Sequence, residues 1–316
     1  MISKIRCVVC CFFILYSIHL TAQVKEVEFI RYEDGVTLSM DLYEPQYPDK
    51  PSNETTPSLS PVVICIFGGG FLWGSRTDAV YRPYYDFLTR QGYTVAAIDY
   101  RLGLKDTKKP PSIFNRKPLI NAISFAVQDL YAATNYLLKN AEALRIDTGK
   151  VILSGSSSGA ITALQADYEK RNRMKNAQIL PGTFQYAGVI AFAGAVYSRE
   201  GKPDYDIPPA PTLFFHGSKD NWVPYNKVSF LGTGIYGSQS LAKRRKKQGY
   251  PYCFYSFENI RHDVAGFPMR EFQPQIQAFL QDFVFSKKAL LIDVNIKDEN
   301  RKDSFMRNPA EVYKKP

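Results

Sequence analysis

A serine between two glycines is the residue of this chain best placed for covalent chemistry. Residues 155–159 read Gly-Ser-Ser-Ser-Gly, so Ser157 stands in the middle of a G-x-S-x-G motif. The apolar run Val151–Leu153 precedes the motif, and helix-compatible residues 161–166 follow it. A serine on such a strand-to-helix turn projects its hydroxyl toward a substrate, and the glycines leave room for neighbouring backbone. Three adjacent serines would also suit a plain turn, but the spacing and the preceding strand favour Ser157 as a nucleophile for acyl transfer.

An activated serine needs a general base, and two histidines outside the N-terminal apolar segment could supply it. His216 ends a buried strand just before the loop with Asp220, whereas His262 follows the last predicted strand, where a loop can hold it over the serine. We therefore predict His262 as the base and Asp220 as the carboxylate that orients it. Serine, acid and histidine then follow one another in an order in which such triads occur. Glu200 and Asp206 remain alternatives for the acid.

Acyl transfer also needs hydrogen-bond donors for the oxyanion of the tetrahedral intermediate. Three consecutive glycines, 68–70, follow the first long apolar run. We expect the backbone N–H groups of Gly69, Gly70 and Ser158 to form the oxyanion hole, where each donor contributes about 10²–10³ in rate. A plain turn at a strand end is the alternative for these glycines.

The pattern of apolar residues predicts the elements that position these groups. Two alternating runs, Val27–Tyr32 and Val36–Leu42, flank Asp34-Gly35 and indicate an antiparallel hairpin. Continuous apolar runs, typical of strands buried on both faces, follow at Val62–Phe67, Tyr93–Ile98, Val151–Leu153, Gly188–Phe192, Thr212–Phe215 and Tyr252–Phe257. A helical stripe spans Leu119–Lys139. The predicted fold is α/β, a mostly parallel doubly wound sheet with an antiparallel N-terminal hairpin.

The chain divides into three segments. Residues 1–22 carry two positive charges and then an apolar run, as a signal peptide does, so we expect a secreted or periplasmic protein without stable membrane insertion after cleavage. An uncleaved membrane anchor is the alternative. Residues 23–286 have the length of one domain, and the charged segment 287–316 has no assignment.

The net charge of +10 raises the question of an anionic partner. The densest basic run, Lys243–Lys247, has no interleaved aromatic residues for base stacking, and it fits a solvated helix end. We expect no nucleic-acid partner. Cys65 and Cys253 lie in apolar runs, where they are expected to act as small hydrophobic residues rather than as a disulfide pair. The oligomeric state is not predicted.

Taken together, these motifs resemble the α/β-hydrolase superfamily, and within it secreted bacterial carboxylesterases and acetyl- or feruloyl-esterase-like enzymes. The resemblance spans about Val62 to Leu280 and rests on residues 67–71, 99–102, 155–159 and 216–220, on Val223-Pro224 and on His262. Hormone-sensitive-lipase-like esterases have His-Gly-Gly-Gly where this chain has Phe67 before its glycines, which separates it from that subfamily. Phe71 and Trp73 resemble acyl-pocket residues but would equally suit a core.

The resemblance implies a carboxylesterase-type serine hydrolase that forms an acyl-enzyme and needs no cofactor or metal. A small-molecule or saccharide ester is the expected substrate, which includes acyl groups linked to polysaccharides. A small-peptide hydrolase and a non-catalytic binding protein of the same fold are the alternatives. Specificity is expected to lie in the loops Lys105–Lys117, Tyr168–Tyr186 and Tyr197–Pro209.

Overall fold

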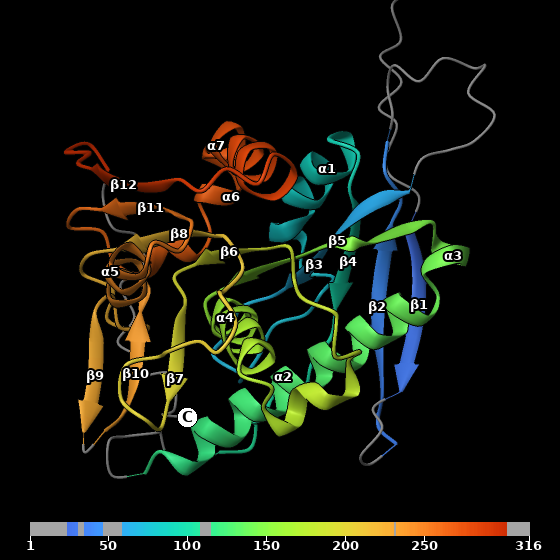
Figure 1. Ribbon diagram of the computed structural model, residues 1–316, viewed down its shortest axis with the longest axis horizontal. Coiled ribbons are helices and arrows are strands. Elements are labelled where there is room, and N and C mark those ends of the chain that lie inside the picture. The colour runs from blue at the N-terminus through green and yellow to red at the C-terminus, as the bar shows by residue number, and fades with distance from the viewer. Residues whose placement is uncertain (1–23, 31–34, 47–58, 108–114, 231, 302–316) are drawn as a thin grey trace, which may run out of the picture.

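The computed structural model of the chain describes residues 24–30, 35–46, 59–107, 115–230 and 232–301 (Figure 1). The expected signal peptide lies outside these residues. So do residues 31 and 32 of the expected hairpin and residues 302–316 of the unassigned C-terminal segment.

Within the described residues, nine strands form one sheet in the order β1-β2-β4-β3-β5-β6-β8-β11-β12. β2 runs antiparallel to β1 and to β4, and the other neighbours pair in parallel. The fold prediction, a mostly parallel sheet with an antiparallel N-terminal hairpin, is confirmed. The strands are β1 (Val24–Ile30), β2 (Thr37–Tyr43), β3 (Ser60–Ile66), β4 (Thr94–Ile98), β5 (Ile146–Ser156), β6 (Gly188–Phe192), β8 (Thr212–Gly217), β11 (Tyr252–Phe257) and β12 (Leu291–Ile296).

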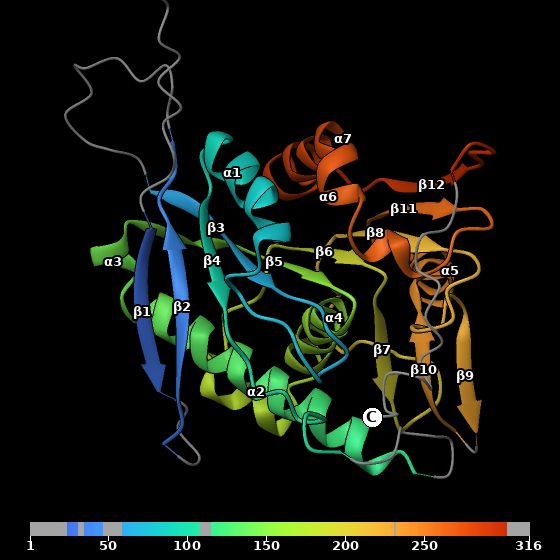
Figure 2. The same cartoon turned by 180° about the vertical axis from the view of Figure 1, so that it is seen from behind.

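Helices cover both faces of this sheet (Figures 1 and 2). One apolar core joins a face of the sheet to α2, α4 and α5, and a second joins the other face to α1, α6 and α7. The α-helices are α1 (Arg82–Arg90), α2 (Lys117–Lys139), α3 (Ala141–Leu144), α4 (Ser158–Arg171), α5 (Ser238–Gln248), α6 (Pro268–Glu271) and α7 (Gln273–Phe279). Shorter helical segments are η1 (Ala79–Tyr81), η2 (Lys175–Ile179), η3 (His262–Ala265) and the π-helical η4 (Leu280–Phe285).

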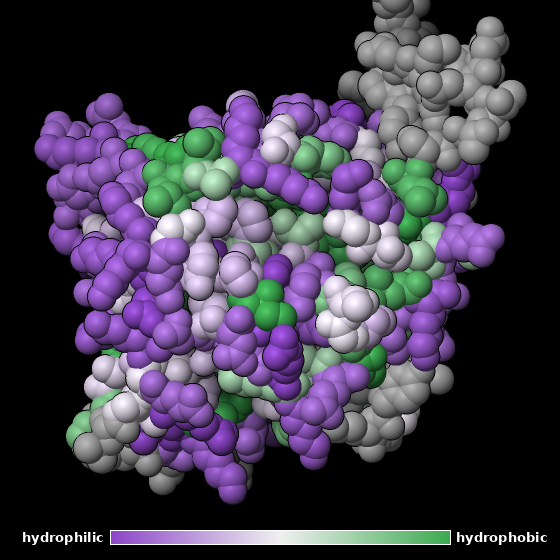
Figure 3. Space-filling view, viewed as in Figure 1, coloured by the Kyte–Doolittle hydropathy of each residue, from purple (hydrophilic) through white to green (hydrophobic). Residues whose placement is uncertain are grey.

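Within the predicted helical stripe, residues at spacings of four, three and four are buried in the core from α2, namely Ala126, Leu130, Ala133 and Leu137. Hydrophilic residues predominate on the molecular face in Figure 3, with smaller hydrophobic areas between them. Among the described residues, no helix combines the length and the apolar character that crossing a bilayer requires.

The structure adds elements that the sequence patterns did not indicate. A second sheet of β7 (Ala195–Ser198), β10 (Thr233–Gly237) and β9 (Lys227–Phe230) stands beside the main one. β12 falls in the segment without assignment and extends the main sheet by pairing with β11. The segment Tyr168–Tyr186, which was expected to be a loop, begins with helical residues, because α4 continues to Arg171.

The basic run lies at the end of α5, as expected, but it is not wholly solvated. Arg245 is only 2% exposed, and its Nη1 donates to the carbonyl of Ala210 at 2.8 Å. Its guanidinium lies over the rings of Tyr205 and Phe214. The aromatic rings and the carbonyl explain how one cation of the run enters the core.

Both cysteines in the described part of the chain are free thiols in the core. Burial raises the pKa of the Cys65 thiol far above its ordinary value, and burial also raises that of Cys253 to about 12. Both thiols therefore stay protonated and act as small apolar groups.

Candidate active site

Ser157 stands on a strained turn between β5 and α4. Its backbone has φ 52° and ψ −117°, a conformation that costs a non-glycine residue free energy. The flanking glycines allow the turn to pack closely. A Cβ on Gly155 would lie 2.2 Å from the carbonyl oxygen of Gly159, and a Cβ on Gly159 would lie 2.2 Å from that of Ile66. The turn therefore requires glycine at both positions, which the motif supplies.

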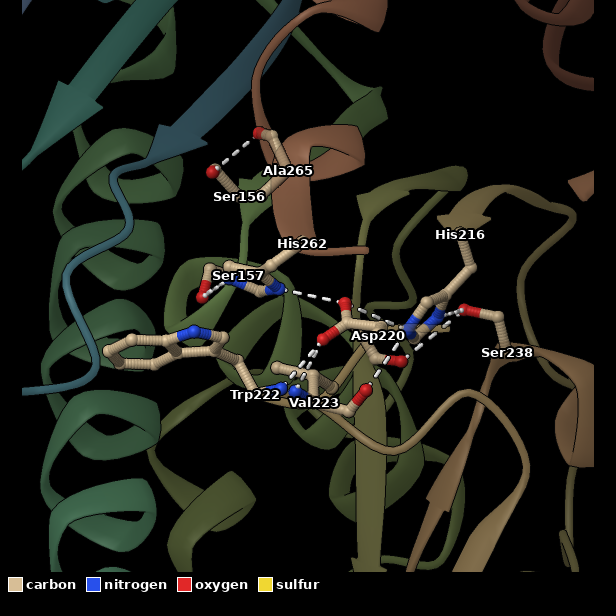
Figure 4. A network of polar contacts seen from close by, with 10 residues as sticks. Ser156, Ser157, His216, Asp220, Trp222, Val223, Ser238, His262 and Ala265 are labelled. Atoms are coloured by element: carbon tan, nitrogen blue, oxygen red, sulfur yellow. Dashed lines mark hydrogen bonds and ion pairs between the residues drawn. The ribbon is translucent and has the colours of Figure 1, made fainter. Parts of the chain in front are cut away.

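A series of hydrogen bonds runs from Ser157 to His262 and on to Asp220 (Figure 4). Ser157 Oγ lies 2.8 Å from His262 Nε2, and His262 Nδ1 lies 2.7 Å from Asp220 Oδ2. A carboxylate can only accept, so we place the imidazole proton on Nδ1, which leaves Nε2 to accept the serine hydroxyl. The structure thus brings together the three side chains that the sequence singled out.

Asp220 is buried and held by several donors. The backbone N–H groups of Trp222 and Val223 donate to its Oδ1 at 2.8 and 2.9 Å. His216 Nε2 lies 3.3 Å from Oδ2, the oxygen that also contacts His262. Burial raises the pKa of Asp220, but the hydrogen bonds and charges of the two histidines outweigh it and hold the pKa well below its usual range. The side chain is therefore ionised at neutral pH.

His216, the other histidine considered as base, is fully buried on the far side of Asp220 (Figure 4). Its Nδ1 lies 2.8 Å from Ser238 Oγ, and its Nε2 lies near Asp220 and the carbonyl of Val223. Its ring therefore supports the carboxylate and is directed away from Ser157.

The alternative acids lie elsewhere. Glu200 lines a separate pocket with Tyr168, and the backbone N–H of Asp206 donates to Asn172 Oδ1. Asp99 directly follows β4 and forms an ion pair with Arg76.

The expected oxyanion donors lie next to Ser157. Gly69 and Gly70 line the same cavity as Ser157, and Ser158 is the first residue of α4. Within the described residues, the N–H groups of Gly69 and Gly70 donate to no protein acceptor. They are therefore available to a ligand.

Two tyrosines brace the glycine loop, and sequence reasoning missed both. Tyr81 Oη accepts a hydrogen bond from the N–H of Gly68 at 2.8 Å. Tyr100 Oη donates to the carbonyl of Phe67 at 3.0 Å and lies 3.2 Å from Ser158 Oγ, while its ring stacks on that of Phe67. Burial raises the pKa of Tyr81, so its hydroxyl stays neutral. The only sequence signal was the position of Tyr100 in the Asp-Tyr-Arg-Leu motif.

The two aromatic residues after the glycines divide between core and cavity. Phe71 is buried against Tyr100, whereas Trp73 is 45% exposed and lines the cavity. The cavity has a volume of about 590 Å³, within the range of small-molecule sites. Trp222 forms another wall, and its ring lies nearly parallel to that of His262, with centroids 6.0 Å apart.

One hydrogen bond joins the serine turn to the histidine loop. Ser156 Oγ donates to the carbonyl of Ala265 at 2.7 Å. Because Ala265 belongs to the same short helix as His262, this bond fixes the loop relative to Ser157. In the described part of the chain, no group of three or more His, Cys, Asp or Glu side chains could hold a metal ion.

Known proteins resemble this chain over parts of its length. It is 32% identical to the fumonisin B1 esterase of Sphingopyxis macrogoltabida over 102 residues, which are 32% of this chain and 18% of that protein. It is 31% identical to the non-reducing polyketide synthase atr1 of Stereocaulon alpinum over 70% of this chain and 7% of that protein. The chain thus spans less than a fifth of the length of these two relatives.

A solved structure with the same fold is that of Thermogutta terrifontis esterase 2 phosphoramylated by tabun. The TM-score is 0.60 at 22% identity, over 84% of this chain and 95% of that one. Residues 40–197, half of the chain, match the BD-FAE family. This stretch contains the glycine loop and Ser157, whereas Asp220 and His262 follow it. The chain therefore belongs to the BD-FAE family and shares the fold of that esterase.

Proposed function

We propose that the protein is a serine esterase that cleaves carboxylic esters through an acyl-enzyme on Ser157. One observation carries the proposal: the unbroken series of short hydrogen bonds from Ser157 through His262 to the ionised Asp220. It lies beside the N–H groups of Gly69 and Gly70, which have no protein acceptor among the residues that the structure describes. This arrangement has the parts that acyl transfer by a serine requires.

In the first half of the reaction, Ser157 Oγ attacks the ester carbonyl carbon while His262 Nε2 takes the hydroxyl proton. The N–H groups of Gly69, Gly70 and Ser158 stabilise the oxyanion. Asp220 stabilises the imidazolium through Nδ1. When the tetrahedral intermediate collapses, His262 returns the proton to the alcohol oxygen, and the alcohol leaves.

Water then replaces the alcohol. His262 takes a proton from the water as it attacks the acyl carbonyl, and the same three N–H groups stabilise the second oxyanion. Collapse of this intermediate releases the carboxylic acid and returns the proton to Ser157.

The rim of the cavity supports a substrate with a polar alcohol part. Asp78, Asp263, Arg270 and Glu271 line the cavity together with Trp73. Charged groups beside an aromatic ring suit a polyhydroxylated alcohol, so we assign the enzyme to esters of saccharides, including acylated polysaccharides. The basic and apolar residues 1–22 support export of the protein, which fractionation of expressing cells would test.

The test is hydrolysis of p-nitrophenyl acetate by the purified protein, beside Ser157→Ala and His262→Ala. Wild type is expected to turn over with a burst of p-nitrophenol, and each variant is expected to lose at least about 10³-fold in kcat. Acetylated xylan and the matching p-nitroanilide are assayed in parallel. Faster cleavage of the anilide would favour a peptidase, and full activity in Ser157→Ala would refute the proposal.

A further inference from the structure

A second cavity shares Trp222 with the cavity over Ser157. It has a volume of about 470 Å³ and lies between the start of α2 and the hairpin of β9 and β10. Figures 1 and 2 show the first turn of α2 near the end of the small sheet at which β9 ends and β10 begins. We call this cavity the hairpin groove. Its apolar lining comprises Leu119, Ile120, Trp222, Val228, Phe230 and Ile235.

The hairpin exposes apolar side chains to water. Phe230 is 59% exposed and Val228 is 51% exposed, and both border the hairpin groove. Single exposed apolar residues are ordinary, but a group of them around a concave surface marks a binding site. The lining indicates a ligand group that is itself apolar.

Trp222 connects this groove to the chemistry. The same side chain lines the cavity of Ser157 and the hairpin groove, and its ring stacks beside the ring of His262. In Figure 4 the Trp222 ring extends below Ser157. Trp222 is therefore the one side chain, among those that line the two cavities, that borders both of them.

The two cavities differ in chemistry. The cavity over Ser157 is bordered by carboxylates and by Arg270, whereas the hairpin groove is walled by aliphatic and aromatic side chains, with Arg116 as its one charged residue among those described. An ester divides at the carbonyl into an acid part and an alcohol part. The polar cavity over Ser157 suits a polar alcohol part. We therefore assign the acid part of the ester to the hairpin groove.

We propose that the hairpin groove binds an extended apolar acyl chain of the ester, with Phe230 and Val228 as specificity-determining residues and Trp222 as the surface over which the chain passes. This inference rests on the proposed esterase activity and narrows it to esters of medium or long apolar acids with polar alcohols.

The test compares p-nitrophenyl acetate, butyrate, hexanoate and octanoate, each below its aggregation concentration, with wild type, Phe230→Ala, Val228→Asn and Leu59→Ala. Leu59 is 58% exposed and borders neither cavity, so it is the matched control. In wild type, kcat/KM is expected to rise about fourfold per methylene once the chain passes Trp222. Phe230→Ala is expected to lower kcat/KM for octanoate about tenfold and to change that for acetate less than twofold.

Acetate turnover keeps the two proposals separable. If acetate is not hydrolysed, or if Ser157→Ala hydrolyses it as wild type does, the esterase proposal fails. If acetate is hydrolysed and Phe230→Ala leaves the dependence on chain length unchanged, only the groove assignment fails. Octyl acetate is assayed as well, and a loss in Phe230→Ala that is confined to octyl acetate would place the alcohol in the groove and overturn the assignment. So would sedimentation showing that Phe230→Ala dissociates a dimer while chain-length preference stays the same.

Discussion

The hydroxyl of Tyr81 accepts a hydrogen bond from the backbone N–H of Gly68, 2.8 Å away. Gly68 immediately precedes the two glycines to which we assign the oxyanion. Tyr100 holds the preceding residue, Phe67, through its carbonyl. Where hormone-sensitive-lipase-like esterases have a histidine in the loop, this chain fixes its loop from two sides with tyrosine hydroxyls.

Replacing Tyr81 by phenylalanine should therefore misplace the oxyanion donors. The change leaves the Gly68 N–H without its acceptor, and a complete loss of one oxyanion donor costs about 10²–10³ in kcat. We expect Tyr81→Phe to lower kcat for p-nitrophenyl acetate about tenfold, with KM nearly unchanged.

The matched control is Tyr85→Phe. Tyr85 lies in α1 with its ring against that of Tyr81, and its hydroxyl makes no hydrogen bond within the described residues. This variant should keep kcat within about twofold. Equal losses in both variants would mean that packing of α1, and not the bond to Gly68, sets the rate.

Replacing each of the two histidines around Asp220 by asparagine should lower kcat/KM by very different amounts. His262→Asn removes the group that moves the proton, so we expect a loss of at least about 10³-fold in kcat/KM. His216→Asn removes one neighbour of the carboxylate, but the N–H groups of Trp222 and Val223 still hold Asp220. We expect only about a tenfold loss. If His216→Asn were as inactive as His262→Asn, the assignment of the base would be wrong.

Asp220→Asn should keep the shape of the site and lose its activity. The amide can present its NH₂ to His262 Nδ1, which would leave the proton on Nε2, where it cannot accept from Ser157. A change of this kind costs about 10⁴ in kcat for such triads. Rescue of the rate at high pH, where hydroxide replaces the base, would support a defect in proton transfer. Loss of the near-ultraviolet circular dichroism would instead indicate misfolding.

Asp220 should also make stability depend on pH. Its pKa in the folded protein lies below the ordinary value of 3.8, so its contribution to stability is fully present above pH 3.8 and is lost as pH falls through the folded value. Urea unfolding of wild type and Asp220→Asn should give a difference in the free energy of unfolding that is constant near neutrality and shrinks below pH 3.8. A difference that grows on acidification would contradict this linkage.

Arg245 should be the one stability-critical cation of its run. Arg245→Ala removes the bond to the Ala210 carbonyl and the contacts with two aromatic rings, and we expect a loss of about 2–3 kcal/mol in the free energy of unfolding. Lys247→Ala, on the exposed face of the same helix, should change it by less than about 0.5 kcal/mol. Similar midpoints for the two variants in urea would show that Arg245 does not contribute to the core.

The sequence predicted the central strands because burial on both faces forces a continuous apolar run, as in Gly188–Phe192 and Tyr252–Phe257, whose bounds match β6 and β11. It did not indicate β9, because all four of its residues are exposed and no face of it has to be apolar. The sequence also did not predict the burial of Arg245, because a charged side chain in a basic run is expected to be exposed to solvent.

In the candidate site, too, some residues could be predicted from the sequence and others could not. Ser157 and the glycines carry a local motif, and His262 and Asp220 follow from their order and their places after strands. The bracing tyrosines and the stacking of Trp222 on His262 depend on residues far apart in the chain. Tyr100 and Ser158, for example, are 58 positions apart. No local pattern encodes such a contact.

The bond between Ser156 and Ala265 joins positions 109 residues apart, so Ser157 cannot gain His262 as its partner until translation has passed β11 and the short helix that follows it. At about 5–20 residues per second, the ribosome needs roughly 5–20 s to cover that interval. Throughout this time the nascent chain carries a nucleophile that has no partner to activate it. In the proposed mechanism, Ser157 therefore stays unactivated until the residues around His262 have been synthesised and have folded onto it.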